Sequence, residues 1–406
     1  MKILFYNHTG QVSGAERVLQ MILRGLDRDR YECVVACPGE SKLAELMNVD
    51  GVRIRGLGTL EARFTWRPDY LLRYLVSFAQ VIREARALVI EETPDIVHAN
   101  SIRAGIVMAA ATIGVRVPVI WHAHDVLPRH PLSTLVRLVA AMSSRNRIVA
   151  VSHAVAKRFR GLVLQPFAKR VPIWVIHNAV DLEKFHPDYE SKSETRAALG
   201  LRDDQPVVGV VGQLTRRKGQ LELIEAVAEV AREIPEARLL VIGEPLFNRD
   251  GEYAEHLRQV AMSPGISDRV RFLGARSDVP QLMQAMDVLV LNSYEEAFAL
   301  TILEGLASGI AVLATKVGGT PEMITHNQNG WLIPPRDDAS LAQALIDLLK
   351  DSDLRARLGQ NARATAVARF SVARFRRDIE ILYSQFIRTA ASKITHQLFD
   401  EKLATD

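Results

Sequence analysis

The chain of 406 residues contains only two cysteines, Cys33 and Cys37, and both fall in one strand-like apolar stretch. Four positions apart on an extended chain, their Cα atoms would lie ~13 Å apart, which is too far for a disulfide bond. This scarcity of cysteine predicts a reduced, cytoplasmic protein. Long apolar runs are also missing, since none approaches the ~18 residues that a membrane-spanning helix needs.

Motifs of several other protein classes are absent. No stretch fits G-x-G-x-x-G, which argues against a nicotinamide dehydrogenase. The basic residues are dispersed without an aromatic-interleaved stripe, so nucleic acid is not the expected partner. The aspartates at 27, 29, 351 and 353 follow or separate helical stretches, whereas a metal-binding pair should end a strand. We therefore expect no bound metal and no cofactor.

The net charge of +4 conceals an asymmetry between the two halves of the chain. Residues 1–180 contain 24 Lys and Arg against 14 Asp and Glu, a net charge of +10, and the remainder contains 27 against 33, a net charge of −6. A basic half predicts an anionic partner, such as a phosphorylated lipid or the inner face of a membrane. An arginine-rich surface that is merely solvated is the alternative interpretation.

Strand patterns alternate with helical patterns along most of the chain. Residues 1–7 form an apolar strand pattern, not a signal peptide, and a helix over about 15–26 follows. The alternation resumes with the strand pattern 207–214, after a polar stretch at 187–194. Such alternation predicts an α/β fold with parallel, doubly wound sheets.

This alternation divides the chain into two domains. The strand pattern 173–180 ends the first unit. We predict an N-terminal domain over residues 1–182, a C-terminal domain over 190–371, and a helix at about 372–388 that packs back on the first domain. The polar tail from Thr389 is either a further helix or a loose end.

The stretch from Asn292 to Glu322, NSYEEAFALTILEGLASGIAVLATKVGGTPE, concentrates polar groups after an apolar strand pattern. It carries two carboxylates, Glu296 and Glu304, with seven residues between them. We expect Glu296 in a loop and Glu304 in the first turns of a helix, whose N-terminus favours an anion such as a diphosphate. The alternative is a capping box, in which Thr301 and Glu304 satisfy only backbone N–H groups.

Two further stretches carry candidate functional side chains. VGQLTRRKG, residues 211–219, is a strand-to-helix turn with three consecutive cations that could grip a diphosphate. WHAHD, residues 121–125, ends an apolar strand with His122 and His124. These histidines have few partners at ligand-like spacing, which disfavours a metal site and leaves a hydrogen-bonded structural role as the alternative.

E-A-F-A-L-T-I-L-E resembles the E-x7-E signature of retaining, family-4 type glycosyltransferases (glycosyl transferases group 1) of the GT-B fold. VGQLTRRKG resembles the family's G-R-x-x-x-x-K-G loop, but Gln213 stands where arginine is usual. Either Arg216 or Arg217 compensates, or the diphosphate is held less tightly. SGAERVL resembles the family's G-G-x-E loop, with Ser13 as the first residue and Gly14 as the second.

The resemblance covers nearly the whole chain and implies two Rossmann-like domains that face each other across a cleft. VIHNAVDLEKF is similar to the landmark V-I-x-N-G-V-D, with Ala179 in place of the glycine, and Asn178 and Asp181 would set the turn between the domains. His98, in DIVHAN, would at most shape the acceptor side.

The implied activity is transfer of a sugar from a nucleotide-diphosphate-sugar donor to a glycan, lipid-linked or small-molecule acceptor, with retention of configuration. In this family, Glu296 would accept donor-sugar hydroxyls, Glu304 would hold the ribose, and His124 would touch the sugar near the reacting carbon. The departing diphosphate would be stabilised by Lys218, by Arg216 or Arg217, and by backbone N–H groups at Phe298, Ala299 and Leu300. The acceptor would attack on the same face, and the leaving phosphate would assist its deprotonation.

Two alternatives stay open at this point. The first is a nucleotide-sugar epimerase or hydrolase on the same fold. The second is a binding protein that keeps the fold without the chemistry, and it is suggested by Gln213 and by Ala299, where the family has glycine.

Overall fold

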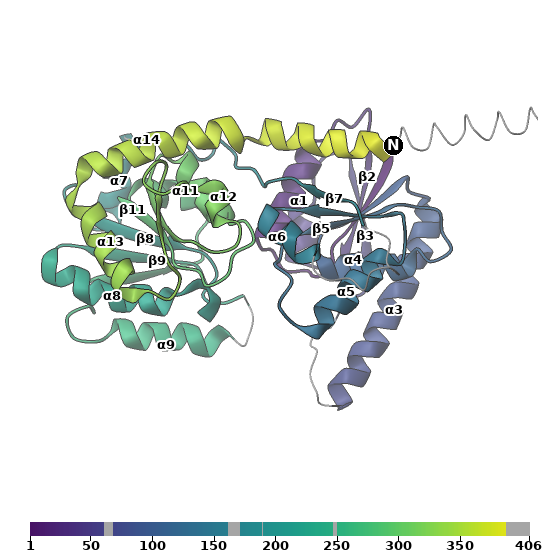
Figure 1. The fold of residues 1–406 in the computed structure, drawn as a ribbon, viewed down its shortest axis with the longest axis horizontal. Coiled ribbons are helices and arrows are strands. Elements are labelled where there is room, and N and C mark those ends of the chain that lie inside the picture. Colours follow the sequence, from purple (N-terminus) through teal and green to yellow (C-terminus); the bar gives the residue numbers. More distant parts are fainter. Residues whose placement is uncertain (61–67, 161–170, 189, 247–249, 387–406) are drawn as a thin grey trace, which may run out of the picture. The chain divides into compact units, whose positions relative to one another are not determined.

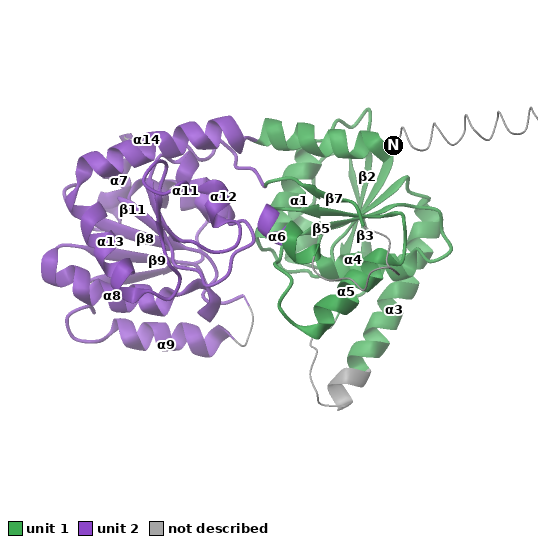
Figure 2. Cartoon of the chain, in the orientation of Figure 1, with its two compact units in different colours: residues 1–151, 156–177, 372–406 green, residues 152–155, 178–371 purple. Residues whose placement is uncertain are grey.

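The structure, a computed structural model, describes residues 1–60, 68–160, 171–188, 190–246 and 250–386. The prediction for the tail from Thr389 therefore lies outside the described residues. The chain forms two compact units, shown in Figure 2. Unit 1 comprises residues 1–151 and 156–177 with a helix over 372–386, and unit 2 comprises residues 152–155 and 178–371.

Unit 1 is built on a parallel sheet of seven strands in the order β3-β2-β1-β4-β5-β6-β7, flanked by helices (Figure 1). Its strands are β1 Lys2–Tyr6, β2 Glu32–Pro38, β3 Val52–Leu57, β4 Ile96–Ala99, β5 Val119–Ala123, β6 Asn146–Ala150 and β7 Ile173–Val175. Its helices are α1 Gly14–Gly25, α2 Lys42–Leu46, α3 Pro68–Glu92, α4 Ile102–Ala111, α5 Pro131–Ala141, α6 His153–Phe159 (whose first three residues belong to unit 2) and the helix over 372–386.

Every residue of β4 and β5 is buried, as expected for central strands that are covered on both faces and therefore apolar throughout. Cys33 and Cys37 lie buried and unbonded in β2, so the prediction that they form no disulfide is confirmed. The strand predicted over 173–180 is shorter in the structure, because the chain leaves the sheet after Val175 and enters unit 2 at Asn178.

Unit 2 is built on a parallel sheet of six strands in the order β10-β9-β8-β11-β12-β13. Its strands are β8 Val207–Val211, β9 Arg238–Ile242, β10 Val270–Gly274, β11 Val288–Leu291, β12 Ala311–Thr315 and β13 Trp331–Ile333. Its helical segments are α7 Glu190–Ala198, the 3₁₀ turn η1 Arg216–Lys218, α8 Gln220–Glu233, α9 Gly251–Ala261, α10 Val279–Gln284, α11 Leu300–Ala307, α12 Thr320–Met323, α13 Asp338–Lys350 and α14 Ser352–Arg369.

Helix α7 begins at Glu190, within the polar stretch at 187–194, where no helix was predicted. Periodicity missed this helix because its only buried residue is a charged one, Arg196. The Arg196 guanidinium donates to Asp287 Oδ2 at 2.8 Å and to the carbonyl oxygens of Ala285 and Gln205 at 3.0 Å. A buried ion pair, not an apolar face, therefore holds α7 against unit 2.

The helix over 372–386 belongs to unit 1, although it follows unit 2 in the sequence. Its residues Phe375, Ile379 and Tyr383 are buried. Tyr383 Oη lies 2.7 Å from Nδ1 of His98 in β4, so this helix contacts the buried interior of the first sheet. Among the helices in the described part of the chain, none is long and apolar enough to span a bilayer.

Candidate active site

Each sheet has one point where the strand order reverses. In unit 1 this point lies between β1 and β4, and in unit 2 it lies between β8 and β11. Ligands of open α/β sheets bind beyond the carboxyl ends of the strands at such a switch point. The residues that directly follow these four strands are therefore the first candidates for function.

In unit 2 the switch point brings a cation and a carboxylate together. Lys218 ends the turn that follows β8, and its Nζ donates to Glu296 Oε2 at 2.6 Å. Ser293, in the loop after β11, donates its hydroxyl to the same oxygen at 3.3 Å. Glu296 is only 8% exposed, so this contact forms in a largely desolvated position.

Glu296 is ionised despite its burial. Burial alone would raise the pKa of its carboxyl, but the charges of Lys218 and Arg217 and the hydrogen bonds from Lys218 and Ser293 outweigh it and hold the pKa below the ordinary 4.5. An ionised carboxylate only accepts hydrogen bonds, and it is thus suited to hydroxyl donors.

The two arginines before Lys218 have different surroundings. Arg217 donates to the carbonyl oxygen of Glu295 at 2.8 Å, and its guanidinium lies 3.8 Å from Glu296 Oε2. The Arg216 guanidinium instead lies over the Tyr253 ring, 5.3 Å from its centroid. Of the two candidates left open by the sequence, Arg217 is the one beside Glu296.

Gln213, in the strand-to-helix turn, is hydrogen-bonded through both its side chain and its backbone carbonyl. Its side-chain Nε2 donates to Asp250 Oδ2 at 2.8 Å, and its carbonyl oxygen accepts from Gln220 at 2.8 Å. These two hydrogen bonds fix Gln213 within the turn.

The capping-box interpretation of Thr301 and Glu304 is wrong. The N-cap of α11 is Ala299 and the helix begins at Leu300, so Thr301 already lies within the helix. Glu304 is the fifth helical residue and is partly exposed. Phe298 and Ala299, expected at the helix start, are both buried, and the Phe298 carbonyl accepts from Asn178 Nδ2 at 3.3 Å. Asn178 thus supports the loop that carries Glu296.

Two glycines allow the loops of this site to touch. At Gly219, where φ is +62°, an added Cβ would come within 2.1 Å of the Asn292 carbonyl oxygen. At Gly318, where φ is +50°, it would come within 1.7 Å of the Glu296 carbonyl oxygen. Larger residues would push away the backbone that positions Lys218 and Glu296.

In unit 1, His124 follows β5 directly and is partly exposed. Its Nε2 lies 3.2 Å from Asn100 Oδ1, and burial lowers the pKa of its imidazole to about 3. At neutral pH His124 is therefore uncharged. Its ring lies 4.1 Å, centroid to centroid, from that of His122.

His98 and His122 are fully buried, so neither is exposed to a ligand. His98 Nε2 lies 3.2 Å from His122 Nδ1, and Tyr383 closes the other side of His98. Burial lowers the pKa of both imidazoles. His122 therefore packs against the His124 ring, and His98 holds His122 in place from the interior of the sheet.

Gly14 is the first residue of α1 and is exposed. The loop before it is held by a capping box, in which the Glu16 carboxylate accepts from the Ser13 backbone N–H at 2.8 Å and from the Ser13 hydroxyl at 2.6 Å. Gly14 was predicted from its motif, whereas Glu16, Asn7 and Asn100 were not predicted as functional residues. The available signal was positional, since Asn7 and Asn100 each come directly after a strand.

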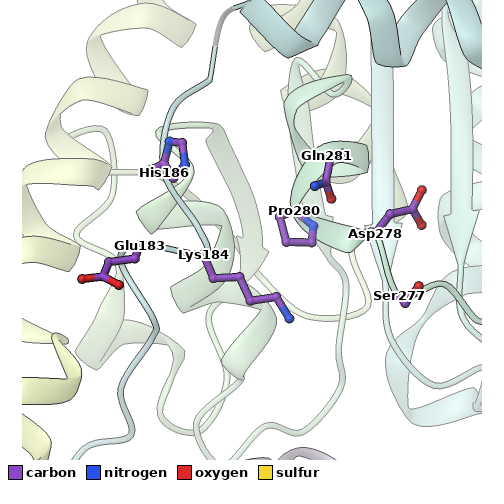
Figure 3. Close-up of a pocket in the computed structure, with 7 residues that line it drawn as sticks. All are labelled: Glu183, Lys184, His186, Ser277, Asp278, Pro280 and Gln281. Atoms are coloured by element: carbon purple, nitrogen blue, oxygen red, sulfur yellow. The ribbon is translucent and has the colours of Figure 1, made fainter.

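A pocket elsewhere in unit 2 is lined by seven residues, Glu183, Lys184, His186, Ser277, Asp278, Pro280 and Gln281 (Figure 3). None of the residues predicted to bind the donor lines it. Its lining mixes both charge signs, and we assign it no role in the candidate site.

Comparison with known proteins supports both halves of this description. Residues 12–184 match the family model described as Glycosyltransferase Family 4, and residues 191–365 match the model described as Glycosyl transferases group 1. The chain belongs to the group 1 GT-B glycosyltransferases. The two models together include Gly14, His124, Lys218 and both glutamates of the E-x7-E motif.

Relatives of this glycosyltransferase differ in how much of the chain they match. The D-inositol 3-phosphate glycosyltransferase of Corynebacterium jeikeium is 36% identical over 203 residues, which are 49% of this chain and 48% of that protein. The chain thus spans about half the length of that relative. The UDP-Gal:alpha-D-GlcNAc-diphosphoundecaprenol alpha-1,3-galactosyltransferase of Escherichia coli is 25% identical over 386 residues, 93% of this chain and 95% of that protein.

Among solved structures, this glycosyltransferase resembles Anabaena Alr3699/HepE in complex with UDP and glucose. The TM-score is 0.79 with 29% sequence identity, and the match covers 95% of this chain and 99% of that one. The same Anabaena protein has also been crystallised with UDP-glucose.

Proposed function

We propose that this glycosyltransferase moves a hexose from a uridine diphosphate sugar to an acceptor, with retention of the anomeric configuration. The observation that carries the proposal is the 2.6 Å contact between Lys218 and Glu296 at the switch point of the second sheet. A diphosphate needs cations, and a sugar needs fixed hydrogen-bond acceptors. Lys218 supplies the cation and Glu296 the acceptor, and the two side chains are hydrogen-bonded to each other.

We assign the side chains of the site the following roles. Lys218 and Arg217 neutralise the diphosphate as negative charge develops on it, and backbone N–H groups at the start of α11, from Phe298 to Leu300, add to this effect. Glu296 accepts hydroxyl groups of the donor sugar, and Glu304 accepts those of the ribose. His124 contacts the sugar near the reacting carbon.

In the proposed reaction, the acceptor oxygen attacks the anomeric carbon from the face that the diphosphate leaves. The bond between this carbon and the diphosphate oxygen breaks, and the acceptor proton passes to the leaving phosphate. No metal or organic cofactor is part of this scheme, because cations and helix N–H groups take the charge of the leaving group.

The relatives suggest the substrate classes. UDP and UDP-glucose occupy the crystallised Anabaena protein, and the E. coli relative is named for a UDP-Gal donor and a diphosphoundecaprenol-linked acceptor. We therefore propose a UDP-hexose donor and an acceptor saccharide carried on a lipid diphosphate.

The first test is thermal stabilisation of the protein by UDP, GDP and ADP and by a panel of UDP-sugars. A ligand that binds only the folded protein raises the melting temperature in proportion to its binding free energy. We expect the largest rise with UDP and one UDP-hexose, and a smaller rise for Lys218→Met but not for Arg216→Met. An equal rise in melting temperature with UDP, GDP and ADP would contradict the proposed donor, and so would the absence of a rise with any of them.

Product analysis with and without acceptor then decides the type of reaction. Release of UDP that requires an acceptor, with a product whose anomeric proton shows the donor's configuration by NMR, supports retaining transfer. Free sugar, or an epimerised nucleotide sugar formed without acceptor, would instead identify a hydrolase or an epimerase.

We also propose that unit 1 contacts an anionic membrane surface from the cytoplasmic side. Residues 126–180 contain nine Lys and Arg and no Asp or Glu. Within the described part of this segment, α5 exposes Leu135 (56%), and Met142 beyond its end is 76% exposed. Arg129 and Arg145 flank them and are also exposed. Apolar side chains between cations suit the interface of an anionic bilayer.

Vesicle flotation tests this contact with a matched pair of variants. Met142 and Met262 are 76% and 75% exposed, and they lie in unit 1 and unit 2 respectively. We expect binding to vesicles of anionic phosphatidylglycerol that weakens with salt, and that weakens several-fold in Met142→Glu but not in Met262→Glu. Equal binding to neutral phosphatidylcholine vesicles would refute the proposal.

A further inference from the structure

Three polar side chains follow three adjacent strands of the first sheet and form a continuous hydrogen-bonded row. Asn7 follows β1, Asn100 follows β4 and His124 follows β5. Asn100 Nδ2 donates to Asn7 Oδ1 at 3.1 Å, and His124 Nε2 lies 3.2 Å from Asn100 Oδ1. The row crosses the switch point of unit 1, where a ligand is expected.

The orientation of the Asn7 amide is set by groups that can only accept hydrogen bonds. Its Nδ2 donates to the Thr9 carbonyl oxygen at 2.9 Å and to Glu16 Oε1 at 3.2 Å. A reversed amide would direct its own oxygen at these two oxygens. Asn7 Oδ1 therefore points to Asn100, as an acceptor.

The Asn100 amide is oriented in the same way. Its Nδ2 faces the Ala15 carbonyl oxygen at 3.2 Å and Asn7 Oδ1 at 3.1 Å, and both of these atoms are acceptors. Its oxygen must then face His124. An amide oxygen can only accept, so the proton of this hydrogen bond belongs to His124 Nε2.

This assignment decides the tautomer of His124. A neutral imidazole carries one proton, and if Nε2 holds it, Nδ1 keeps its lone pair and acts as an acceptor. The row is therefore directional: each donor points from His124 through Asn100 and Asn7 toward the Glu16 carboxylate. Glu16 is 4% exposed, and it also accepts from Ser13, as described above.

We propose that Glu16, Asn7 and Asn100 are positioning residues that hold His124 as its Nε2–H tautomer and so present Nδ1 as an acceptor to a hydroxyl group of the bound sugar. This inference rests on the proposed function only for the identity of the sugar. The tautomer itself is a property of the ligand-free protein. A hydrogen-bond acceptor at Nδ1 would select for a hydroxyl donor at one position of the sugar ring.

Long-range ¹H–¹⁵N NMR of the full-length protein labelled at histidine measures the tautomer without any substrate. The His124 signals are assigned by their loss in His124→Gln. We expect protonated Nε2 and unprotonated Nδ1 in the wild type. Protonated Nδ1, or a mixture of both tautomers, would overturn the proposal whatever the activity.

The matched variants are Asn100→Leu and Asn146→Leu. Both asparagines are buried in unit 1, but Asn146 begins β6 at the opposite end of the sheet, and its amide donates to the Ala140 carbonyl oxygen at 2.9 Å. Both variants should lose similar stability. Only Asn100→Leu should lose the pure Nε2–H signature and about tenfold in kcat/KM, the effect of one neutral hydrogen bond.

Donor analogues that each lack one sugar hydroxyl connect the tautomer to the substrate. We expect one analogue to lose activity in the wild type but to lose little more in Asn100→Leu, because the same contact is already weakened. If removing each sugar hydroxyl lowers the activity of Asn100→Leu by the same factor as that of the wild type, the proposed role of Nδ1 is contradicted. If no donor is used by the wild type, the proposed function fails, yet the NMR result still decides the positioning of His124.

Discussion

The two switch points use the same backbone plan with opposite chemistry. In unit 2 the residues beyond β8 and β11 form an ion pair, Lys218 with Glu296. In unit 1 the residues beyond β1, β4 and β5 form a row of neutral amides and an imidazole that ends on one buried carboxylate, Glu16. The comparison shows a charged pair at the switch point of unit 2 and an uncharged acceptor, His124, at that of unit 1.

The difference has an energetic reason. A charged diphosphate must meet fixed opposite charge, and partial burial strengthens that attraction relative to water. A hydroxyl group needs only a correctly oriented acceptor, which a neutral imidazole offers without the cost of burying a charge. The following tests separate the two cases, from the largest expected effect to the smallest.

Replacing Glu296 with alanine should break the charged site. We expect Glu296→Ala to lower kcat/KM by about 10³-fold or more, because both an acceptor for the sugar and the partner of Lys218 disappear. UDP release measures the activity, and far-UV circular dichroism should show an intact fold. The control is Glu295→Ala, which removes the exposed carboxylate next to Glu296 in the sequence. Near-normal turnover of Glu296→Ala would sink the site assignment.

Replacing Lys218 with methionine should reduce kcat/KM by about 10²-fold and change its pH dependence. Without Lys218, burial raises the pKa of the Glu296 carboxyl with less opposition. The variant should therefore lose activity at a higher pH than the wild type as the solution is acidified. Profiles of kcat/KM between pH 5 and 9 check this, with Arg216→Met as the control. An unshifted acid limb would show that Lys218 does not control the ionisation of Glu296.

Acid should destabilise unit 1 more than unit 2. The pKa of His98 is lowered by burial to about 3, so between pH 6.5 and 3 the unfolded chain binds more protons than the folded one. Each such histidine lowers the free energy of unfolding by up to about 1.4 kcal/mol per pH unit below 6.5. The stabilisation is complete above pH 6.5 and is lost as the pH falls.

Tryptophan fluorescence during urea unfolding separates the units. Trp331 lies in unit 2, so Trp331→Phe leaves a signal from unit 1, in which Trp121 and Trp174 lie. We expect the urea midpoint of this variant to fall steeply from pH 7 to 4. The fluorescence of Trp331 itself is obtained by subtracting the Trp331→Phe signal from that of the wild type. The urea midpoint of this difference should fall less between pH 7 and 4. Parallel decreases in both signals would contradict a histidine origin in unit 1.

The smallest effect is expected for Gln213→Arg. An added cation in the turn that leads to Lys218 should tighten UDP binding about three- to fivefold, the effect of a partly solvated charge contact. Isothermal titration calorimetry measures the affinity, and Gln213→Met controls for the lost hydrogen bond to Asp250. Weaker binding in both variants would show instead that the hydrogen bond from Gln213 to Asp250 positions this turn.

The sequence predicted the general architecture because strand and helix patterns depend on local residue order. The strand predicted over 1–7 corresponds to β1, Lys2–Tyr6, and the helix predicted over about 15–26 corresponds to α1, Gly14–Gly25. The family resemblance, carried by the E-x7-E motif and the basic turn, was confirmed by both family models. Helix α7 was missed because charge pairing, and not an apolar face, stabilises it.

Other features depended on groups far apart in the chain, and only the tertiary structure decided them. The capping box at Thr301 is plausible from local spacing, but α11 already begins at Leu300 with Ala299 as its N-cap, so Thr301 lies inside the helix. The choice of Arg217 over Arg216 beside Glu296 depends on Tyr253, which holds the other guanidinium.

The asparagine row gives the clearest division between sequence and structure. Asn7 and Asn100 are ordinary polar residues after strands, and no local pattern distinguishes them from turn residues. They meet only because β1 and β4, 93 positions apart, are neighbours at the point where the strand order reverses. The sequence determined the fold family and the charged donor motifs, since these are written in contiguous residues. The direction of each hydrogen bond in the row from His124 to Glu16 was decided by the packing of three strands.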